Sequence, residues 1–287
     1  MSEISPTAQR REVGSLLRAH RERVGLTAVE VAGRVGISAA KLSRLERGLR
    51  GLQIADVRSL CAVYELSEDE TRELIAATRA SREPGWWTEF SALGADAPRV
   101  FGLESAADSS EEYAAILVPG LLQTADYARA VISQVRPDAD FSEAVVSERV
   151  EARMMRSSLL LPVLDRRVHF VIDESVLLRC VGSAEIMSAQ LRELVLASER
   201  PNVILQILPF AVGAHAGVEG SFVVHGFGDA IQRDVVFVEG LSGTLLIDNH
   251  TQVEAYRRAF SAVAQQALDP EASRRRLCTV ERQWQAS

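Results

Sequence analysis

Residues 27–48, with the sequence TAVEVAGRVGISAAKLSRLERG, constrain the fold of this chain more than any other stretch. They are predicted to form two short helices that meet at a turn. Thr27 and Ser38 are favourable N-caps for the two helices, because a hydroxyl can accept a hydrogen bond from a backbone N–H of the first turn. Gly36 allows the sharp turn between the helices, and Gly48 is placed to end the second one.

The two sides of the second helix differ in character. Leu42 and Leu45 are spaced to bury on one side, whereas the other side presents small residues and long cations. Such a helix, held across a short turn, suits the reading of base edges in the major groove of DNA. We therefore predict base contacts from Ala39, Ala40, Lys41 and Arg44. We predict phosphate contacts from Thr27, Ser38, Ser43, Arg47 and Arg50. The alternative is a packed helix pair whose charged side is only solvated.

The distribution of charge favours DNA binding. The formal net charge is −7, but residues 1–58 contain eleven Lys and Arg against six Asp and Glu. The remaining residues contain twenty-one Lys and Arg against thirty-three Asp and Glu. A local basic surface can bind phosphates while the acidic remainder is repelled by DNA. Lys41 is the only lysine, and Arg58 lies just after the helix pair, where a phosphate would pass.

The pattern across the two helices resembles the helix-turn-helix of the Cro/C1 repressor (XRE) class. It is carried by Val31, Ala32, Gly36, Ile37, Ser38, Leu42, Ser43, Arg44, Leu45, Glu46 and Gly48. The resemblance implies a lambda-repressor-like domain of five helices that binds a double-stranded DNA operator. In this class an arginine of the first helix commonly pairs with the glutamate that ends the recognition helix. The resemblance therefore implies a structural ion pair between Arg21 and Glu46.

Periodicity and composition divide the chain into three parts. Residues 1–80 are predicted to be an all-α DNA-binding domain, with the other helices near 8–24, 54–64 and 67–80. Residues 81–105 are predicted to be a linker, because Pro, Gly, Ser and Ala are concentrated there. Two adjacent indoles, Trp86 and Trp87, interrupt this linker. We expect them to dock on one domain or at a dimer interface.

Residues 106–287 alternate between strand and helix periodicity, which predicts a mixed α+β domain around a small sheet. The predicted strands lie near 168–172, 203–208, 221–227, 235–239 and 244–247. A predicted helix over 141–161 has an arginine-rich side that carries Arg149, Arg153 and Arg156. Because glutamates occur at pairing distances on the same helix, we expect this side to be solvated rather than to bind DNA.

A second resemblance concerns this C-terminal part. The tryptophan pair, the run LVPGLLQTADYARA (117–130) and the run LPFAVGAHAGVEGSF (208–222) are similar to the DUF5753 domain. That domain follows an XRE-type helix-turn-helix in many regulators. The resemblance implies a regulator often encoded beside a small DUF397 protein, an arrangement similar to a toxin–antitoxin pair. It implies no known ligand or reaction.

The sequence contains no recognisable catalytic pattern. The glycine-rich loop 213–220 lies between two strands and fits no phosphate-binding pattern, so we expect a flexible hairpin loop. Neither a metal nor another cofactor is expected, because metal-ligand spacing is missing from the set His215, His225, His250, Asp229 and Asp248. Three scattered cysteines, with no apolar span or signal peptide, predict a cytoplasmic, nucleoid-associated protein without a membrane partner.

The sequence thus favours a DNA-binding transcriptional regulator that is not an enzyme. The helix from about Ser38 to Arg47 would read the major groove, and a small protein partner or ligand would act through the C-terminal domain. We expect a homodimer with its contacts in residues 81–287, including the tryptophan pair. One alternative is an antitoxin-like interaction protein that sequesters a small DUF397-type partner, with autoregulation secondary. An enzyme controlled by a DNA-binding domain is another.

Overall fold

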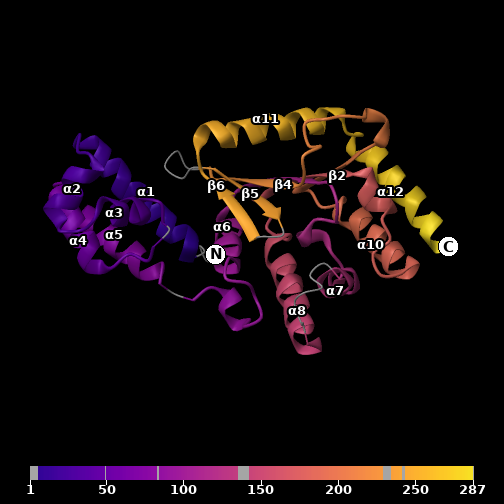
Figure 1. Ribbon diagram of the computed structural model, residues 1–287, viewed down its shortest axis with the longest axis horizontal. Helices are drawn as coiled ribbons and strands as arrows, with labels where there is room; N and C mark the ends of the chain where they lie inside the picture. The colour runs from indigo at the N-terminus through magenta and orange to yellow at the C-terminus, as the bar shows by residue number, and fades with distance from the viewer. Residues whose placement is uncertain are drawn as a thin grey trace. The chain divides into compact units, whose positions relative to one another are not determined.

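The structure, a computed structural model, describes residues 6–48, 50–82, 84–134, 142–228, 234–240 and 243–286. They divide into two compact units. The first lies within residues 1–88, 97–106 and 227–233, and the second within 89–96, 107–226 and 234–287. The predicted fold class is confirmed, because a helical N-terminal region is followed by an α+β region with a six-stranded mixed sheet (Figure 1). No helix within the described ranges is long and apolar enough to cross a membrane.

Five helices make up the N-terminal part of the first unit. They are α1 (Pro6–Arg23), α2 (Ala28–Val35), α3 (Ala39–Glu46), α4 (Ile54–Val63) and α5 (Glu68–Ala80). α2, α3 and α4, with 8, 8 and 10 residues, are too short to be stable in isolation, so their stability depends on packing. Their apolar faces share one core, in which Leu17, Leu42 and Leu60 are fully buried. This shared core is what holds α2 and α3 at a defined angle.

The segment 81–105, which the sequence predicts to be a linker, contains regular structure. It contains the 3-10 helix η1 (Trp86–Glu89) and most of the helix α6 (Ala97–Ala106). The ring of Trp86 stacks on the ring of Phe101 with centroids 5.2 Å apart, and Trp87 is only 5% exposed. Burial of Trp87 and stacking of the half-buried Trp86 outweigh the low helix propensity of the surrounding Pro and Gly. Burial of Trp87 within the chain agrees with the first of the two expectations, docking on one domain, and leaves its ring little surface for a dimer contact.

The second unit is built on one sheet with the strand order β3-β2-β1-β4-β5-β6. The strands are β1 (Ser109–Ala114), β2 (Arg167–Asp173), β3 (Val203–Leu208), β4 (Phe222–Gly226), β5 (Val235–Gly240) and β6 (Gly243–Ile247). β1, β2 and β3 run parallel, and β4, β5 and β6 extend the sheet by antiparallel pairing. In β2, Phe170 and Ile172 enter the core on one face and Val171 the core on the other, as the two-residue period requires.

Helices cover both faces of this sheet (Figure 1). α11 (His250–Gln266) packs on one face. The core on the other face includes residues of α7 (Ala125–Gln134), α9 (Glu174–Leu178), α10 (Ala184–Ala197) and α12 (Pro270–Gln285). α8 (Glu143–Leu160) packs against α7 and against the 3-10 helix η2 (Gly120–Leu122). A further 3-10 helix, η3 (Phe210–Val212), follows β3.

The spacing of charges on α8 predicts that its arginine-rich side is solvated. In the structure, this side contacts other parts of the second unit. Arg149 donates a hydrogen bond to the carbonyl oxygen of Ala92 at 2.8 Å, and Arg153 donates to the side-chain oxygen of Gln123. Burial, and then the like charge of Arg156, lowers the pKa of Arg153 to about 10. The tertiary fold places the segment 89–96 and the end of η2 against this side, which helical spacing alone does not reveal.

The loop 213–220 does not close a hairpin. It connects β3 to β4, and these strands are separated in the sheet by β2 and β1. The loop therefore crosses the end of the parallel strands, where the ring of His215 packs edge-on against Tyr113 with centroids 5.6 Å apart. The hairpin prediction was wrong because order along the chain does not determine which strands are neighbours.

Candidate nucleic-acid interface

A capping box begins the first helix of the pair. The hydroxyl of Thr27 accepts a hydrogen bond from the N–H of Glu30 at 3.3 Å, and the carboxylate of Glu30 accepts from the N–H of Thr27 at 2.7 Å. Hydrogen bonds from the hydroxyl and then the backbone of Thr27 lower the pKa of Glu30. The hydroxyl predicted to meet a phosphate is thus engaged in holding α2, although Thr27 remains exposed.

The turn between the helices is held by its own hydrogen bonds. Gly36 ends α2 in the left-handed region, at a φ of 74°, and its N–H donates to the carbonyl of Ala32. A side chain with a Cβ rarely adopts this conformation, which explains the glycine. Ser38 begins α3, because its hydroxyl accepts a hydrogen bond from the N–H of Lys41 at 3.1 Å.

The inner side of α3 is anchored by two kinds of contact. Leu42 and Leu45 are fully buried in the core. Glu46, only 6% exposed, accepts two hydrogen bonds from Arg21 of α1, from Nε at 2.6 Å and from Nη2 at 3.0 Å. The hydrogen bond to Glu46 raises the pKa of Arg21. The same guanidinium donates to the carbonyl of Leu26 at 2.9 Å, so the pair ties α3 to the loop before α2.

α1 approaches the end of α3 very closely at Gly14. A Cβ on Gly14 would lie 2.5 Å from the carbonyl oxygen of Leu45 and 2.7 Å from that of Glu46. Only glycine permits this distance without movement of a backbone. The orientation of α3 is thus set jointly by the core, the Arg21–Glu46 pair and this contact.

The outer side of α3 presents unpaired cations. Ala40, Arg44 and Arg47 are exposed and follow one another at helical spacing, and Arg50 is exposed just beyond the helix. Within the described ranges, none of these arginines has a carboxylate in ion-pairing distance. Arg47 donates only to the carbonyl of Ser43, at 3.3 Å. Because these arginines have no carboxylate partner among the described residues, their guanidinium groups are available to phosphates and base edges.

Lys41 differs from these arginines because it has a partner. Its ammonium donates to Oδ1 of Asp56 at 2.9 Å, and the two side chains are 24% and 16% exposed. Asp56 belongs to α4 and was not singled out by the sequence. The sequence marks Asp56 only as an acidic residue in the first turn of a helix, which is a common stabilising feature and does not indicate a binding role.

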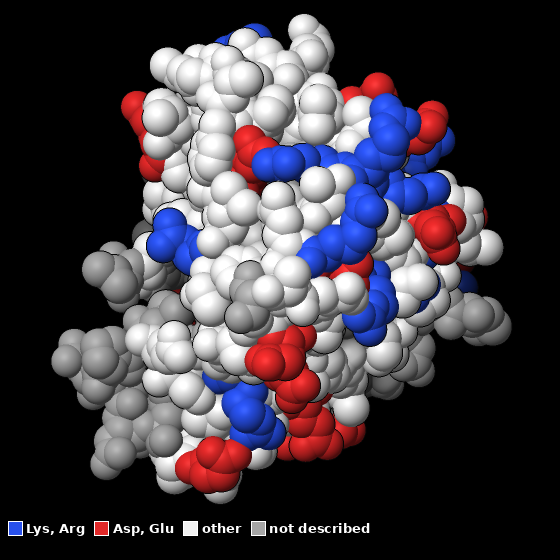
Figure 2. Space-filling view, turned by 90° about the vertical axis from the view of Figure 1, so that its right-hand side faces the viewer, with Lys and Arg blue, Asp and Glu red and all other residues white. Residues whose placement is uncertain are grey.

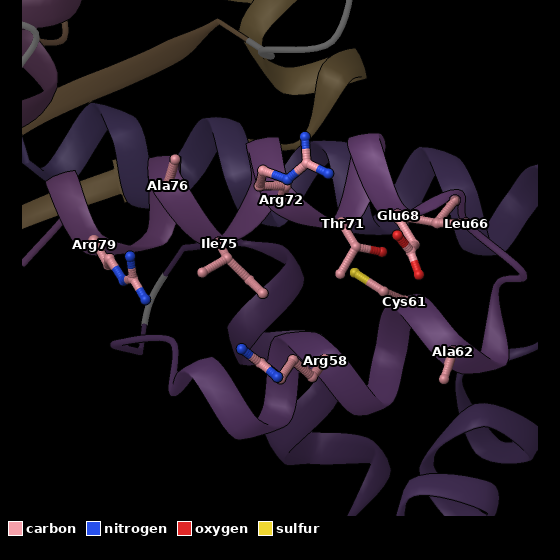
Figure 3. Close-up of a pocket in the computed structure, with 10 residues that line it drawn as sticks. All are labelled: Arg58, Cys61, Ala62, Leu66, Glu68, Thr71, Arg72, Ile75, Ala76 and Arg79. Carbon is pink, nitrogen blue, oxygen red and sulfur yellow. The ribbon is translucent and has the colours of Figure 1, made fainter.

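Arg58 lies on a different surface from the one the sequence suggested. It lines a groove of about 510 Å³ between α4 and α5, together with Arg72 and Arg79 (Figure 3). Residues two apart on a helix point to different sides. Arg58 therefore does not share the side of α4 from which Asp56 meets α3, and we do not include it among the phosphate contacts.

Many arginines of the second unit are neutralised by acids. Figure 2 shows a face on which Lys and Arg gather in a band with Asp and Glu beside them. Ion pairs of α12 with α10, within itself and with α9 are Arg192 with Glu281 at 3.1 Å, Arg275 with Glu271 at 2.7 Å and Arg276 with Glu174 at 2.6 Å. Such pairing is typical of a solvated surface, and it contrasts with the arginines on the outer side of α3, which have no carboxylate partner within the described ranges.

The histidines considered as metal ligands lie in different surroundings. Nδ1 of His225 hydrogen-bonds to the buried hydroxyl of Ser110 at 2.8 Å, whereas His215 lies in the loop before β4 and His250 begins α11. Asp229 lies outside the described residues. Among the residues that are described, no three potential metal ligands come together.

The fold and this surface define a class, namely a helix-turn-helix DNA-binding regulator with a separate α+β domain. Family comparisons agree with this class. The family described as "Helix-turn-helix domain" matches residues 12–74, and "Domain of unknown function (DUF5753)" matches residues 97–279. The chain belongs to the DUF5753 family, whose match begins at the first residue of α6 rather than at residue 106. No curated protein and no solved structure matches the chain.

Proposed function

We propose that the first unit is an XRE-type operator-binding domain that reads the major groove with the helix from about Ser38 to Arg47. The outer side of α3 carries this proposal. There, exposed arginines without carboxylate partners stand opposite a face that is fully anchored. If this surface were only solvated, a group of unpaired cations on it would be unfavourable, because like charges repel one another.

Different positions on α3 suit different contacts. Arg44 lies in the middle of the outer side, next to Ala40, where a guanidinium can reach guanine O6 and N7. Ala39 and Ala40 are short enough to let the helix approach the bases and to contact thymine methyl groups. Arg47 and Arg50 lie towards and beyond the end of α3, and we assign them to phosphates.

Arg44→Ala and Arg47→Ala test this assignment in competition binding over a randomised operator. Arg44→Ala should flatten the preference at one base pair, which corresponds to about 1–3 kcal/mol. Arg47→Ala should weaken all sequences alike and reduce the salt slope by about one. Arg79→Ala is the matched control, because this exposed arginine lines the α4–α5 groove. Equal loss on every sequence for Arg44→Ala would make Arg44 a phosphate contact.

We further propose that the protein acts as a homodimer on a two-fold operator. One module of this size buries too little surface for strong specific binding at cellular salt. Two half-sites about one helical turn apart would supply the missing affinity. Sedimentation of the full chain, alone and on duplexes with one or two half-sites, tests the stoichiometry. One chain bound per complete operator would contradict it.

For the second unit we propose a regulatory, non-catalytic role, in which a small protein or a ligand changes operator affinity. The second unit taken by itself is acidic, and this supports the proposal, because such a domain opposes non-specific DNA binding by repulsion. A coupling of about 1–3 kcal/mol is typical. Operator affinity should be measured at fixed salt with and without the neighbouring DUF397-type protein. A stoichiometric complex that leaves operator affinity unchanged would instead favour the antitoxin-like alternative, sequestration of that partner.

A further inference from the structure

We propose that Asp56 is a specificity-determining residue that positions Lys41 for base recognition. This inference rests on the proposed function of the first unit, and it adds a residue outside the recognition helix. Lys41 is in the first turn of α3, and the N-terminal residues of a recognition helix are the ones that meet base edges. Its side chain is the only one on α3 that is paired with a carboxylate at the outer surface.

The choice of lysine at this position is unusual for the chain. The sequence contains 32 Lys and Arg, and Lys41 is the only lysine among them. An ammonium is a compact charge with three donors on a flexible stem, whereas a guanidinium is a rigid planar fork. One ammonium can therefore donate to Asp56 and still direct its two remaining N–H groups elsewhere. Guanine O6 and N7 are acceptors on the major-groove edge that such donors can reach.

Asp56 is well placed to hold this ammonium. It lies in the first turn of α4, where the helix dipole favours a negative charge. Among the described residues, Lys41 is its only hydrogen-bond partner. The pair is partly buried, at 24% and 16% exposure, so its attraction is screened less than that of an exposed pair. The flexible lysine stem is thereby immobilised before DNA arrives, and less side-chain entropy is lost on binding.

The carboxylate also determines what Lys41 can bind. A negative charge 2.9 Å from the ammonium repels a DNA phosphate that approaches the same group. A base edge is uncharged and is not repelled in this way. Asp56 therefore directs Lys41 towards bases and away from the backbone. This arrangement lowers affinity for DNA in general and raises discrimination between sequences.

Asp56→Asn tests the inference in the full chain, because it keeps the shape and removes the charge. Discrimination at one base pair should fall about 5- to 20-fold, within the range of one specific base contact. Affinity for random duplex should rise, and the salt slope should steepen by about one, since the freed ammonium can neutralise a phosphate. The matched control is Asp69→Asn, which makes the same charge change in an exposed pair with Arg72 on α5. Equal behaviour of the two variants overturns the inference.

Chemical labelling of Lys41 gives a second readout that does not depend on affinity. Besides the α-amine, Lys41 carries the only primary amine of the chain, so acetylation by acetic anhydride can be followed there by mass spectrometry. Operator DNA should protect Lys41, and Asp56→Asn should label faster than the wild type when free. A wild type that binds a preferred sequence without protecting Lys41 overturns the inference alone. A wild type without any sequence preference overturns the proposed function, and the inference with it.

Discussion

Replacing Glu46 with glutamine should destabilise the first unit by about 3 kcal/mol, because it breaks one side of a buried ion pair. Glu46 is 6% exposed and the Arg21 side chain 12%, so water cannot replace the lost partner. The new amide nitrogen would face Nη2 of Arg21, donor against donor. The bond from Arg21 to the carbonyl of Leu26 remains, which places the loss at the lower end of the range for such pairs.

Hydrogen exchange of the α3 amides in the full chain measures this loss where it occurs. A loss of about 3 kcal/mol raises the equilibrium population of the opened form of α3, and with it the exchange rate of its amides, by more than a hundredfold. Asp69→Asn is the matched control, because Asp69 pairs with Arg72 at the surface of α5, at 81% and 74% exposure, and should cost less than about 1 kcal/mol. Similar small losses in the two variants would refute the reasoning about burial. The double change Arg21→Met with Glu46→Leu should recover most of the stability, since no charge is left unpaired.

Two further predictions concern stability. Gly14→Ala should lower the free energy of unfolding in urea by about 1–3 kcal/mol, because its Cβ would meet the carbonyl of Leu45 at 2.5 Å. The control is Gly33→Ala, which should be neutral or stabilising because no atom lies within 4 Å of its Cβ. Equal changes in the free energy of unfolding for Gly14→Ala and Gly33→Ala would show that α1 can move away from α3 without loss of stability. Burial lowers the pKa of His169 below 6.5, so the unfolded chain binds the proton more readily and the second unit should lose stability as the pH falls from 6.5 through the lowered pKa. His169→Gln should flatten the dependence of the melting temperature of the second unit on pH. An unchanged dependence in this variant would mean that another titratable group is responsible.

Local patterns account for what was predicted well. The α2–α3 pair is defined by hydroxyl caps, a glycine at the turn and apolar spacing, all of which act within a few residues. Five of the six strands were predicted from short apolar runs for the same reason, whereas β1, with the sequence SSEEYA, has no such run and was not among the predicted strands. The helix α6 was not predicted because Pro and Gly indicate local flexibility, and the ring packing that overrides it comes from distant contacts such as Trp86 with Phe101.

The sequence alone therefore determined a basic helix-turn-helix domain joined to an acidic α+β domain, together with the residues on the outer side of α3. These features depend on charge, periodicity and capping, which neighbouring residues express by themselves. Only the tertiary structure decided the strand order, the close approach at Gly14 and the partner of Lys41. Lys41 and Asp56 lie on different helices, so their contact depends on how the shared core fixes the angle between α3 and α4. The packing of elements distant in the chain, which no local pattern encodes, brings the carboxylate to the recognition helix.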